Sequence, residues 1–348
     1  MPAPVHRDRR RSLARRRVRR LASTATTAAL AGLIGGIVAT ARPRPLVPWA
    51  ASPDPPEGLP PARVLRVPGH GEMFYRTADG PSAAAPTVLL LHGWMFPADL
   101  NWFTTFGPLA EVARVIAPDH RGHGRGTRPT APFRLVDVAD DAAALVRQLG
   151  TGPVVVVGYS MGGPVAQLLW QRHPDVVRGL VCCATAATFS DSVRERWVWR
   201  AMGVLQVGLR LLPRFWLERL AQAQLDGRLP FRVSRMLHDQ TPAEVKALLP
   251  WFIGELDRDS AEDVAEAGRE LGRYDARGWL PSLDVPAAVL ITTRDGLVPL
   301  DRQRDLAARL PGAVVYELPL DHDAPAAAPD LFTSTLCKAV QQVLDAAE

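Results

Sequence analysis

One serine stands in a setting that suits covalent chemistry. Ser160 lies between Gly158 and Gly162, directly after the apolar run 154–157, and a helical pattern follows it. A side chain on a sharp strand-to-helix turn has strained backbone angles, and the two glycines remove the Cβ atoms that would collide there. The hydroxyl would project at a helix N-terminus, where free N–H groups favour an oxyanion. The spacing therefore predicts Ser160 as a nucleophile.

The elements around this serine alternate between strands and helices. Two short strands are predicted at 63–67 and 72–76. Continuous apolar runs, typical of central parallel strands covered on both faces, occupy 87–91, 114–117, 154–157, 180–183, 287–292 and 314–318. Helical patterns lie between them, for example at 135–149, 161–172 and 300–310. This alternation predicts an α/β fold with right-handed crossovers.

One long stretch interrupts the alternation. Between about Phe189 and Leu280 no buried-strand run occurs, and the patterns at 197–212 and 214–225 are helical, apolar and aromatic, separated by Pro213. We expect a helical insertion here, on the edge of the sheet where the strands end.

Further motifs, in order along the chain, carry a resemblance to a known family. Leu91-His92-Gly93-Trp94 ends an apolar strand, and residues 119–124 match an Asp-x-Arg-Gly-x-Gly turn. From about Val64 to its C-terminus the chain resembles the α/β-hydrolases of the esterase and lipase-like group. The resemblance implies an α/β fold with a mostly parallel eight-stranded sheet, helices on both faces and a helical cap. The core would comprise 63–188 and 281–348, and the cap 189–280.

The resemblance also implies the partners of Ser160. The triad acid of the group sits at the place of Asp295, which ends an apolar strand, although an N-capping or turn-forming role is the alternative. The base follows the acid along the chain in this fold, and His322 is the only histidine after Asp295. Asp321 and Asp323 flank that histidine, favour its charged form and remain alternative acids. The backbone N–H groups of Trp94 and Met161 would form the oxyanion hole.

Metal and cofactor chemistry are not expected. His120 and His123 stand close together, but their motif is structural in the resembling group, as is His92, and no carboxylate or thiol is spaced to complete a ligand set. The three cysteines offer neither a zinc spacing nor a disulfide framework, and they are interpreted as buried thiols.

The expected function is hydrolysis of a small-molecule carboxylic ester through an acyl-enzyme on Ser160. Aromatic residues after the oxyanion glycine and in the insertion would line an apolar pocket for an acyl chain, or would form the core of the cap. The candidate pocket residues are Met95, Phe96, Tyr159, Trp197 and Trp216. Perhydrolase, haloperoxidase-like, C–C hydrolase and acyltransferase chemistries share such a triad. A binding protein without catalysis is the alternative of another class.

Charge is distributed unevenly along the chain. Residues 1–44 hold eleven arginines and a single acid, whereas acidic side chains outnumber basic ones by five in the rest. A nucleic-acid partner is therefore not expected for the folded body. Residues 1–20 form an Arg-rich tail, the uncharged segment 21–41 resembles a signal peptide or membrane anchor, and 42–62 is a Pro-rich linker. This order favours a body tethered or exported outside the cytoplasm, and a disordered extension on a cytoplasmic protein is the alternative.

Overall fold

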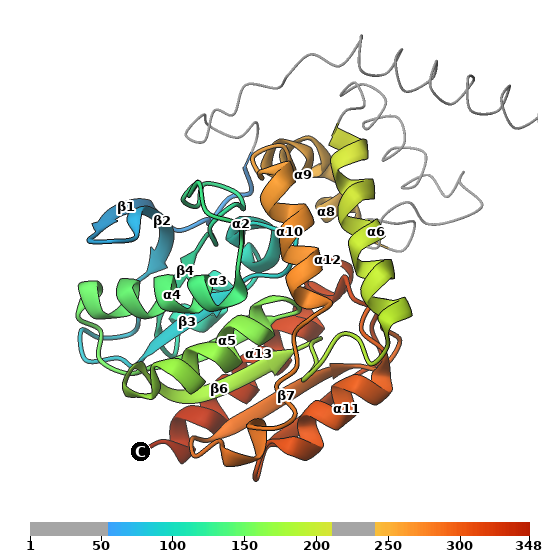
Figure 1. Ribbon diagram of the computed structural model, residues 1–348. Coiled ribbons are helices and arrows are strands. Elements are labelled where there is room, and N and C mark those ends of the chain that lie inside the picture. Colours follow the sequence, from blue (N-terminus) through green and yellow to red (C-terminus); the bar gives the residue numbers. More distant parts are fainter. Residues whose placement is uncertain (1–54, 211–240) are drawn as a thin grey trace, which may run out of the picture.

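The computed structural model describes residues 55–210 and 241–348, and its centre is one twisted sheet (Figure 1). The strand order is β1-β2-β4-β3-β5-β6-β7-β8. The strands are β1 Ala62–Val67, β2 Gly71–Ala78, β3 Thr87–Leu91, β4 Arg114–Pro118, β5 Val154–Tyr159, β6 Val177–Cys183, β7 Ala287–Thr292 and β8 Val314–Leu318. Only β2 pairs antiparallel with its neighbours β1 and β4; all other pairs are parallel. The predicted mostly parallel eight-stranded sheet is confirmed.

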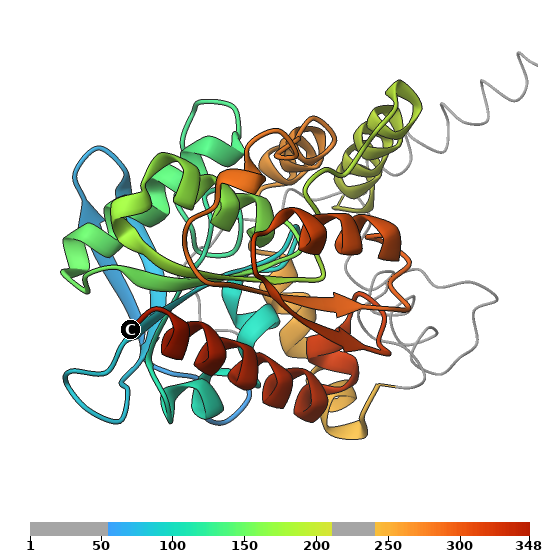
Figure 2. The same cartoon turned by 90° about the horizontal axis from the view of Figure 1, so that it is seen from below.

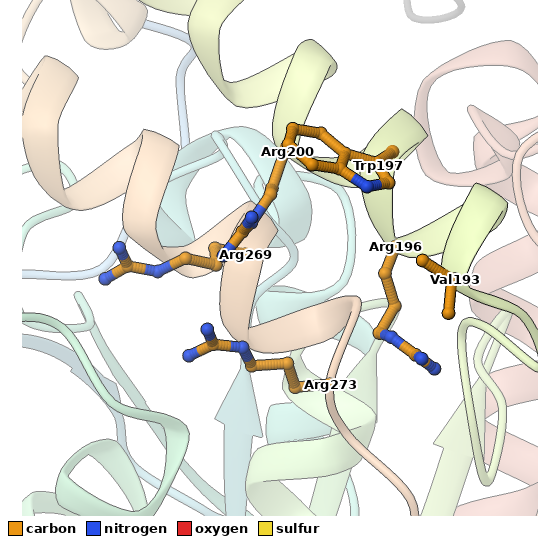
Figure 3. A pocket seen from close by; sticks show the side chains of 6 residues that line it. All are labelled: Val193, Arg196, Trp197, Arg200, Arg269 and Arg273. Atoms are coloured by element: carbon orange, nitrogen blue, oxygen red, sulfur yellow. The ribbon is translucent and has the colours of Figure 1, made fainter.

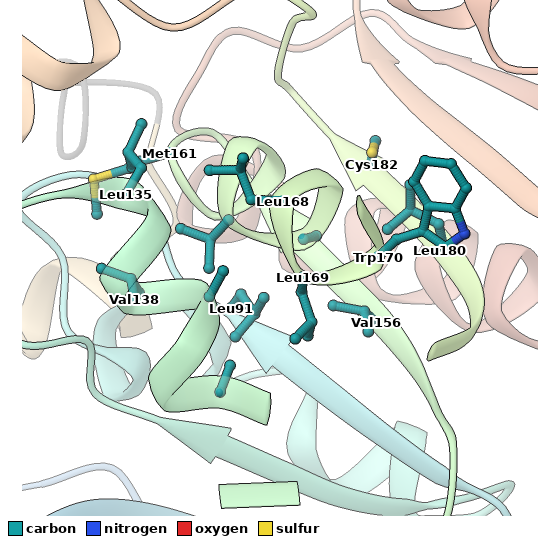
Figure 4. Packing of buried hydrophobic residues seen from close by; sticks show 14 of the residues in the cluster. Leu91, Leu135, Val138, Val156, Met161, Leu168, Leu169, Trp170, Leu180 and Cys182 are labelled. Carbon is teal, nitrogen blue, oxygen red and sulfur yellow. The ribbon is translucent and has the colours of Figure 1, made fainter. Parts of the chain in front are cut away.

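Helices cover both faces of this sheet, as Figure 2 shows. On one face lie α4 (Leu135–Leu149), α5 (Gly162–Arg172) and α11 (Leu300–Arg309), whose apolar side chains join a core with β3, β5 and β6 (Figure 4). On the other face lie α2 (Ala98–Trp102), α3 (Phe106–Ala110) and α13 (Pro329–Ala346). The central strands β3 and β5 are buried along their whole length. Two-sided burial explains their unbroken apolar runs.

The insertion between β6 and β7 is helical in the part that the structure describes. It contains α6 (Val193–Arg210), α8 (Ala243–Ala247), α9 (Leu249–Leu256) and α10 (Ala261–Leu271). Figure 1 shows these helices gathered beyond one end of the sheet. The short helices η1 (Pro174–Val176), η2 (Leu280–Ser282) and α12 (Ala324–Ala327) complete the described elements. The predicted helix at 214–225 lies outside the described residues.

Three of the segments predicted at the N-terminus fall wholly or mostly outside the described residues. These are the tail 1–20, the segment 21–41 and most of the linker 42–62. Within 55–210 and 241–348, no helix combines the length and the apolar character that crossing a membrane requires.

A buried ion network joins α9 to the body. The Arg125 guanidinium donates two hydrogen bonds of 2.6 Å to Glu255 of α9 and lies 3.4 Å from Asp99 of α2. Arg76 of β2 binds Asp99 through two further hydrogen bonds, of 2.5 and 2.7 Å. Glu255 and Asp99 are fully buried. The network also acts on the nearby Asp119. Burial and the charge of Asp99 raise the pKa of Asp119 to about 6, although Arg125 opposes this shift.

This network predicts a large penalty for removing one partner. Glu255→Met leaves the Arg125 guanidinium without its bidentate partner, and we expect the free energy of unfolding to fall by about 3–5 kcal/mol. Adding Arg125→Met removes the guanidinium that has lost two hydrogen bonds and should restore part of the loss, while the buried Arg258, 3.2 Å from Glu255 in the wild type, keeps its charge. Denaturant unfolding of both variants measures these changes.

The control is Glu317→Met, which removes the exposed partner of Arg304. We expect this change to cost less than about 1 kcal/mol. Equal losses for Glu255→Met and Glu317→Met would contradict a specific role of the buried network.

Candidate active site

The turn after β5 holds Ser160 in an unusual backbone conformation. Its φ is 51°, a left-handed value that costs a residue other than glycine about 1–2 kcal/mol. A Cβ on Gly162 would overlap the carbonyl oxygen of Leu91 at the end of β3, and a Cβ on Gly158 would overlap the carbonyl of Gly162. Both glycines are therefore required by space, as the sequence predicts.

Hydrogen bonds on both sides hold the strained turn in place. The Ser160 N–H donates to the Cys183 carbonyl at the end of β6, at 2.9 Å. The Ser160 carbonyl accepts from the Thr185 hydroxyl at 2.7 Å and from the Gly163 N–H at 2.9 Å. A fourth hydrogen bond, from the Val165 N–H to the Met161 carbonyl, lies in the first turn of α5. Together these four hydrogen bonds oppose relaxation of the turn. A strained backbone conformation persists only when the surrounding structure holds it in place.

The structure brings Ser160, His322 and Asp295 into one hydrogen-bonded chain. His322 Nε2 lies 2.9 Å from Ser160 Oγ, and His322 Nδ1 lies 2.7 Å from Asp295 Oδ2. Ser160 follows β5, Asp295 follows β7 and His322 follows β8, so the three side chains meet at one edge of the sheet. This is the arrangement of nucleophile, base and orienting acid.

The surroundings of Asp295 keep its carboxyl group ionised. Burial alone would raise the pKa of Asp295, but the His322 ring and hydrogen-bond donors outweigh burial and hold this pKa below its ordinary value. Oδ1 accepts from the N–H groups of Leu297 and Val298, each at 2.8 Å, and Oδ2 accepts from the Thr292 hydroxyl at 2.8 Å. An ionised carboxylate only accepts hydrogen bonds. His322 Nδ1 therefore carries a proton, and in the neutral ring Nε2 is free to accept the proton of Ser160.

The alternative acids have other positions. Asp321 Oδ1 accepts from the N–H groups of Gly296 and His322, at 2.9 and 2.8 Å, so it links the loop of the histidine to the loop of Asp295. Asp323 is buried before α12. Of the three candidate acids, Asp295 is the one whose carboxylate faces the His322 ring, through Nδ1.

Tyr159 supports the histidine from below. Its hydroxyl donates to the His322 carbonyl at 2.6 Å, and its ring packs between Trp102 and Phe332. Burial, together with the negative charge of Asp295, raises the pKa of Tyr159 well above its ordinary value, so the phenol keeps its proton. Tyr159 was predicted as a pocket residue, and the structure places it beneath the His322 loop.

The loop after β3 lies against Ser160. A Cβ on Gly93 would lie 3.3 Å from the Ser160 Cβ, and the Gly93 N–H donates to the Asn101 side chain at 2.7 Å. Met95, two residues after Gly93, has a φ of 69° and is a second strained position. The candidate oxyanion donor Trp94 lies between Gly93 and Met95 in the chain. The other candidate donor, Met161, directly follows Ser160.

A neutral histidine braces this loop. His92 Nε2 accepts from the His120 N–H at 2.8 Å, so Nδ1 carries the proton and donates to the Gly93 carbonyl at 2.8 Å. Burial, followed by the neighbouring His120 and His123, lowers the pKa of His92 well below its ordinary value. Burial and His123 also lower the pKa of His120 to about 3. Among the described residues, no group of three or more His, Cys, Asp or Glu side chains could hold a metal ion.

The Trp94 side chain joins the same loop to the insertion. Its indole N–H donates to the Val264 carbonyl of α10 at 2.7 Å, and its ring lies 5.7 Å from that of Trp199 on α6. Gly268 of α10 faces this ring so closely that a Cβ would lie 2.8 Å from Trp94 Cζ2. Any movement of α10 would therefore act directly on the loop that carries a candidate oxyanion donor.

The other candidate pocket residues are distributed over the insertion and its contacts. Met95 and Phe96 are half-buried; Met95 packs against the core that contains Trp94, and Phe96 packs against the cluster of Trp251 and Phe252. Trp197 is 62% exposed on α6, beside a hollow that neither Ser160 nor His322 lines. Trp216 lies outside the described residues.

Several supporting residues carry no recognisable sequence signal. Asn101 binds the Gly93 N–H, and Gln303 donates to the carbonyls of Thr292 and Val298 while its Nε2 lies 3.3 Å from Asp295. Asn101 lies on α2, after β3, and Gln303 lies on α11, after β7. Neither residue is part of a short motif, so the spacing along the chain does not predict its contact.

Comparisons with known proteins show the family and the fold. The family model of the alpha/beta hydrolase fold matches residues 86–324. A pimeloyl-[acyl-carrier protein] methyl ester esterase of Chromobacterium violaceum is 32% identical over 248 residues, which cover 69% of this chain and 88% of that protein. A thermophilic esterase from Thermogutta terrifontis is similar in structure, with a TM-score of 0.62 and 25% identity over 81% of this chain and 99% of its own. An enol-lactonase from Burkholderia xenovorans LB400 has the same fold, with a TM-score of 0.64 and 24% identity over 80% of this chain and 100% of its own.

Proposed function

Since the chain belongs to the α/β-hydrolase fold family, we propose that it is a serine hydrolase that cleaves a carboxylic ester through an acyl-enzyme on Ser160. The observation that carries this proposal is the unbroken chain from Asp295 through His322 to Ser160, with distances of 2.7 and 2.9 Å. These distances lie within hydrogen-bond reach for proton transfer.

The reaction has two halves. His322 Nε2 takes the proton of Ser160 as Oγ attacks the ester carbonyl carbon, and the same proton then goes to the leaving alcohol. In the second half water attacks the acyl carbon, with His322 again as the base; the bond to Ser160 Oγ then breaks, the carboxylic acid leaves, and His322 returns the proton to Ser160. Asp295 stays ionised throughout and stabilises the positive ring, in agreement with its lowered pKa.

The oxyanion would lie between the N–H groups of Trp94 and Met161. Two observations support this location: Gly93 approaches Ser160 closely, and Asn101 and His92 hold the loop that carries Trp94. Donors held in place before the reaction stabilise the developing charge without reorganisation, and each such donor contributes about 2.7–4 kcal/mol to the lowering of the barrier.

The relatives support an ester as the bond cleaved. The Chromobacterium protein is named for a methyl ester on an acyl-carrier protein, and the Thermogutta protein is named as an esterase. Perhydrolase, C–C hydrolase and transferase chemistries would use the same Ser160 and differ in their products. A non-catalytic binding protein, the alternative of another class, would lack a reactive serine. The reactivity of Ser160 is therefore tested first.

Ser160→Ala should abolish labelling by a fluorophosphonate probe, because the probe phosphonylates only an activated serine. We expect turnover of an aryl ester to fall by about 10³-fold or more. Gel fluorescence and a spectrophotometric assay measure the two effects. Ser334→Ala, an exposed serine of α13, is the matched control and should leave both unchanged. Absence of labelling of the folded wild-type protein would overturn the proposal.

Asp295→Asn should lower kcat by about 10³–10⁴-fold while the protein stays folded, because the amide no longer selects the productive tautomer of His322. Asp321→Asn touches the same loop but not the ring, so we expect a loss of at most about tenfold. Steady-state kinetics of both variants decide between the two carboxylates. A larger loss for Asp321→Asn would assign the role of the acid to Asp321.

We propose that the substrate is a hydrophobic ester. Trp94 and the half-buried Met95 and Phe96 stand on the loop beside Ser160, and the apolar side chains of α9 lie behind Phe96. Trp251 and Phe252 are themselves buried in ring contacts with Phe103, so they belong to the packing of the insertion rather than to an open pocket wall.

A panel of aryl esters of increasing acyl length tests this substrate class. We expect kcat/KM to rise with chain length by roughly threefold or more per buried methylene, up to the length that the site accommodates. A sharp preference for acetate would contradict the hydrophobic substrate while leaving the serine hydrolase proposal intact.

A further inference from the structure

A cationic hollow lies on the outer side of the insertion, between α6 and the C-terminal end of α10. Its volume is about 170 Å³. Figure 3 shows the lining side chains, which are Val193, Arg196, Trp197, Arg200, Arg269 and Arg273. We call this part of the protein the α6–α10 surface. It is a local reversal of charge, because acidic side chains outnumber basic ones in residues 45–348 as a whole.

The acids near the start of α6 do not neutralise this surface. Glu195 binds Arg302 of α11 at 2.8 Å, and Asp191 binds Arg277 at 2.7 Å. Within the described parts of the chain, Arg196 and Arg200 have no ion pair. Glu195 of α6 thus faces the body, whereas Arg196 and Arg200 face outward.

The two arginines from α10 and its end are only loosely paired. Arg269 lies 3.3 Å from Glu266, and Arg273 lies 3.8 Å from Glu270, with half or more of the Arg273 side chain exposed. Pairs this long and this exposed contribute little. Their guanidinium groups can therefore turn toward an anion in the hollow at small cost.

Exposed apolar side chains adjoin the arginines. Val193 and Trp197 are each 62% exposed and Val198 is 52% exposed, on one stretch of α6. Exposed large hydrophobic residues are few in the described structure, and three of them fall within these six positions. The Arg200 guanidinium lies 5.2 Å from the centre of the Trp197 ring. An exposed tryptophan flanked by arginines is typical of a surface that meets a membrane interface.

We propose that the α6–α10 surface docks the protein on an anionic phospholipid surface. The arginines bind lipid phosphate groups, for which the guanidinium fork is well shaped, and Trp197 with Val193 and Val198 enters the headgroup layer. The apolar side chains protrude from a helix at the edge of the molecule, a shape that suits a soft lipid layer. Docking here brings α10, and through Gly268 the loop of Trp94, close to the lipid.

The test uses a reporter on the surface itself, since the Arg-rich residues 1–44 could also bind anionic vesicles. In the full-length chain with Cys337→Ser, Val193→Cys is labelled with an environment-sensitive fluorophore; Cys182 and Cys183 are buried. Leu331→Cys, 44% exposed on α13, is the matched control position. We expect a blue shift at position 193, and none at 331, with phosphatidylcholine vesicles that contain phosphatidylglycerol. Vesicles of phosphatidylcholine alone should produce little change.

A charge-matched pair of variants tests the arginines. Arg196→Ala with Arg200→Ala should weaken the vesicle affinity reported at position 193 by at least about tenfold. Arg147→Ala with Arg304→Ala removes the same charge from exposed ion pairs on α4 and α11 and should change it by less than about twofold. Fluorophosphonate labelling of Ser160 in each variant checks that the fold is intact.

Three outcomes would overturn the proposal. Vesicle binding without a response at position 193, or with equal responses at 193 and 331, would assign the binding to another part of the chain. Equal responses to zwitterionic and anionic vesicles would exclude recognition of a net negative lipid charge. The same shift with soluble glycerol phosphate or with poly-glutamate, in the absence of lipid, would assign the surface to a free anion or to an acidic protein.

Discussion

The close packing of three backbone segments controls the geometry of the whole site. The end of β3, the turn after β5 and the first turn of α5 meet with no space for a Cβ on Gly162, which faces the Leu91 carbonyl. Ser160, two residues before this contact, has a left-handed conformation, and the loop of Gly93 lies beside the serine. Ser160 and the loop of the candidate oxyanion donor Trp94 thus meet at one contact. Asp295 and His322 reach this point from the ends of β7 and β8.

Asp295 and His322 are also held by hydrogen bonds other than the one between them. Asp295 is surrounded by donors from its own loop and from α11, and His322 is held through its backbone by Tyr159 and Asp321. The ring and the carboxylate therefore meet in one orientation before any substrate arrives. A site prepared in this way loses little free energy to reorganisation during the reaction.

The sequence predicted the parts of this protein that follow local rules. Buried parallel strands leave apolar runs, and the crowded turn at Ser160 requires glycines, so both could be located from residue types and spacing. Asp295 and His322 were placed by resemblance, and the geometry then chose Asp295 over Asp321 as the neighbour of the ring. Asn101, Gln303 and the ion network around Arg125 were not predicted, because their contacts join segments far apart in the chain. Trp197 was expected near the substrate, but an amphipathic helix does not reveal which of its sides faces the core.

The insertion is attached to the body in two different ways. Through α9 and α10 it is joined by the buried Arg125–Glu255 pair, by the Gly124 N–H bound to Asp259 at 2.6 Å and by Trp94. Described residues of α6 meet the body through the partly exposed pair of Glu195 with Arg302 and through Trp199, whose ring lies 5.7 Å from that of Trp94. The two halves therefore depend to different degrees on the rest of the fold. A substitution on the outer side of α6 alters the surface that the protein presents and leaves the body in place, whereas a substitution at the contacts of α9 and α10 has to be matched in the loops that they touch.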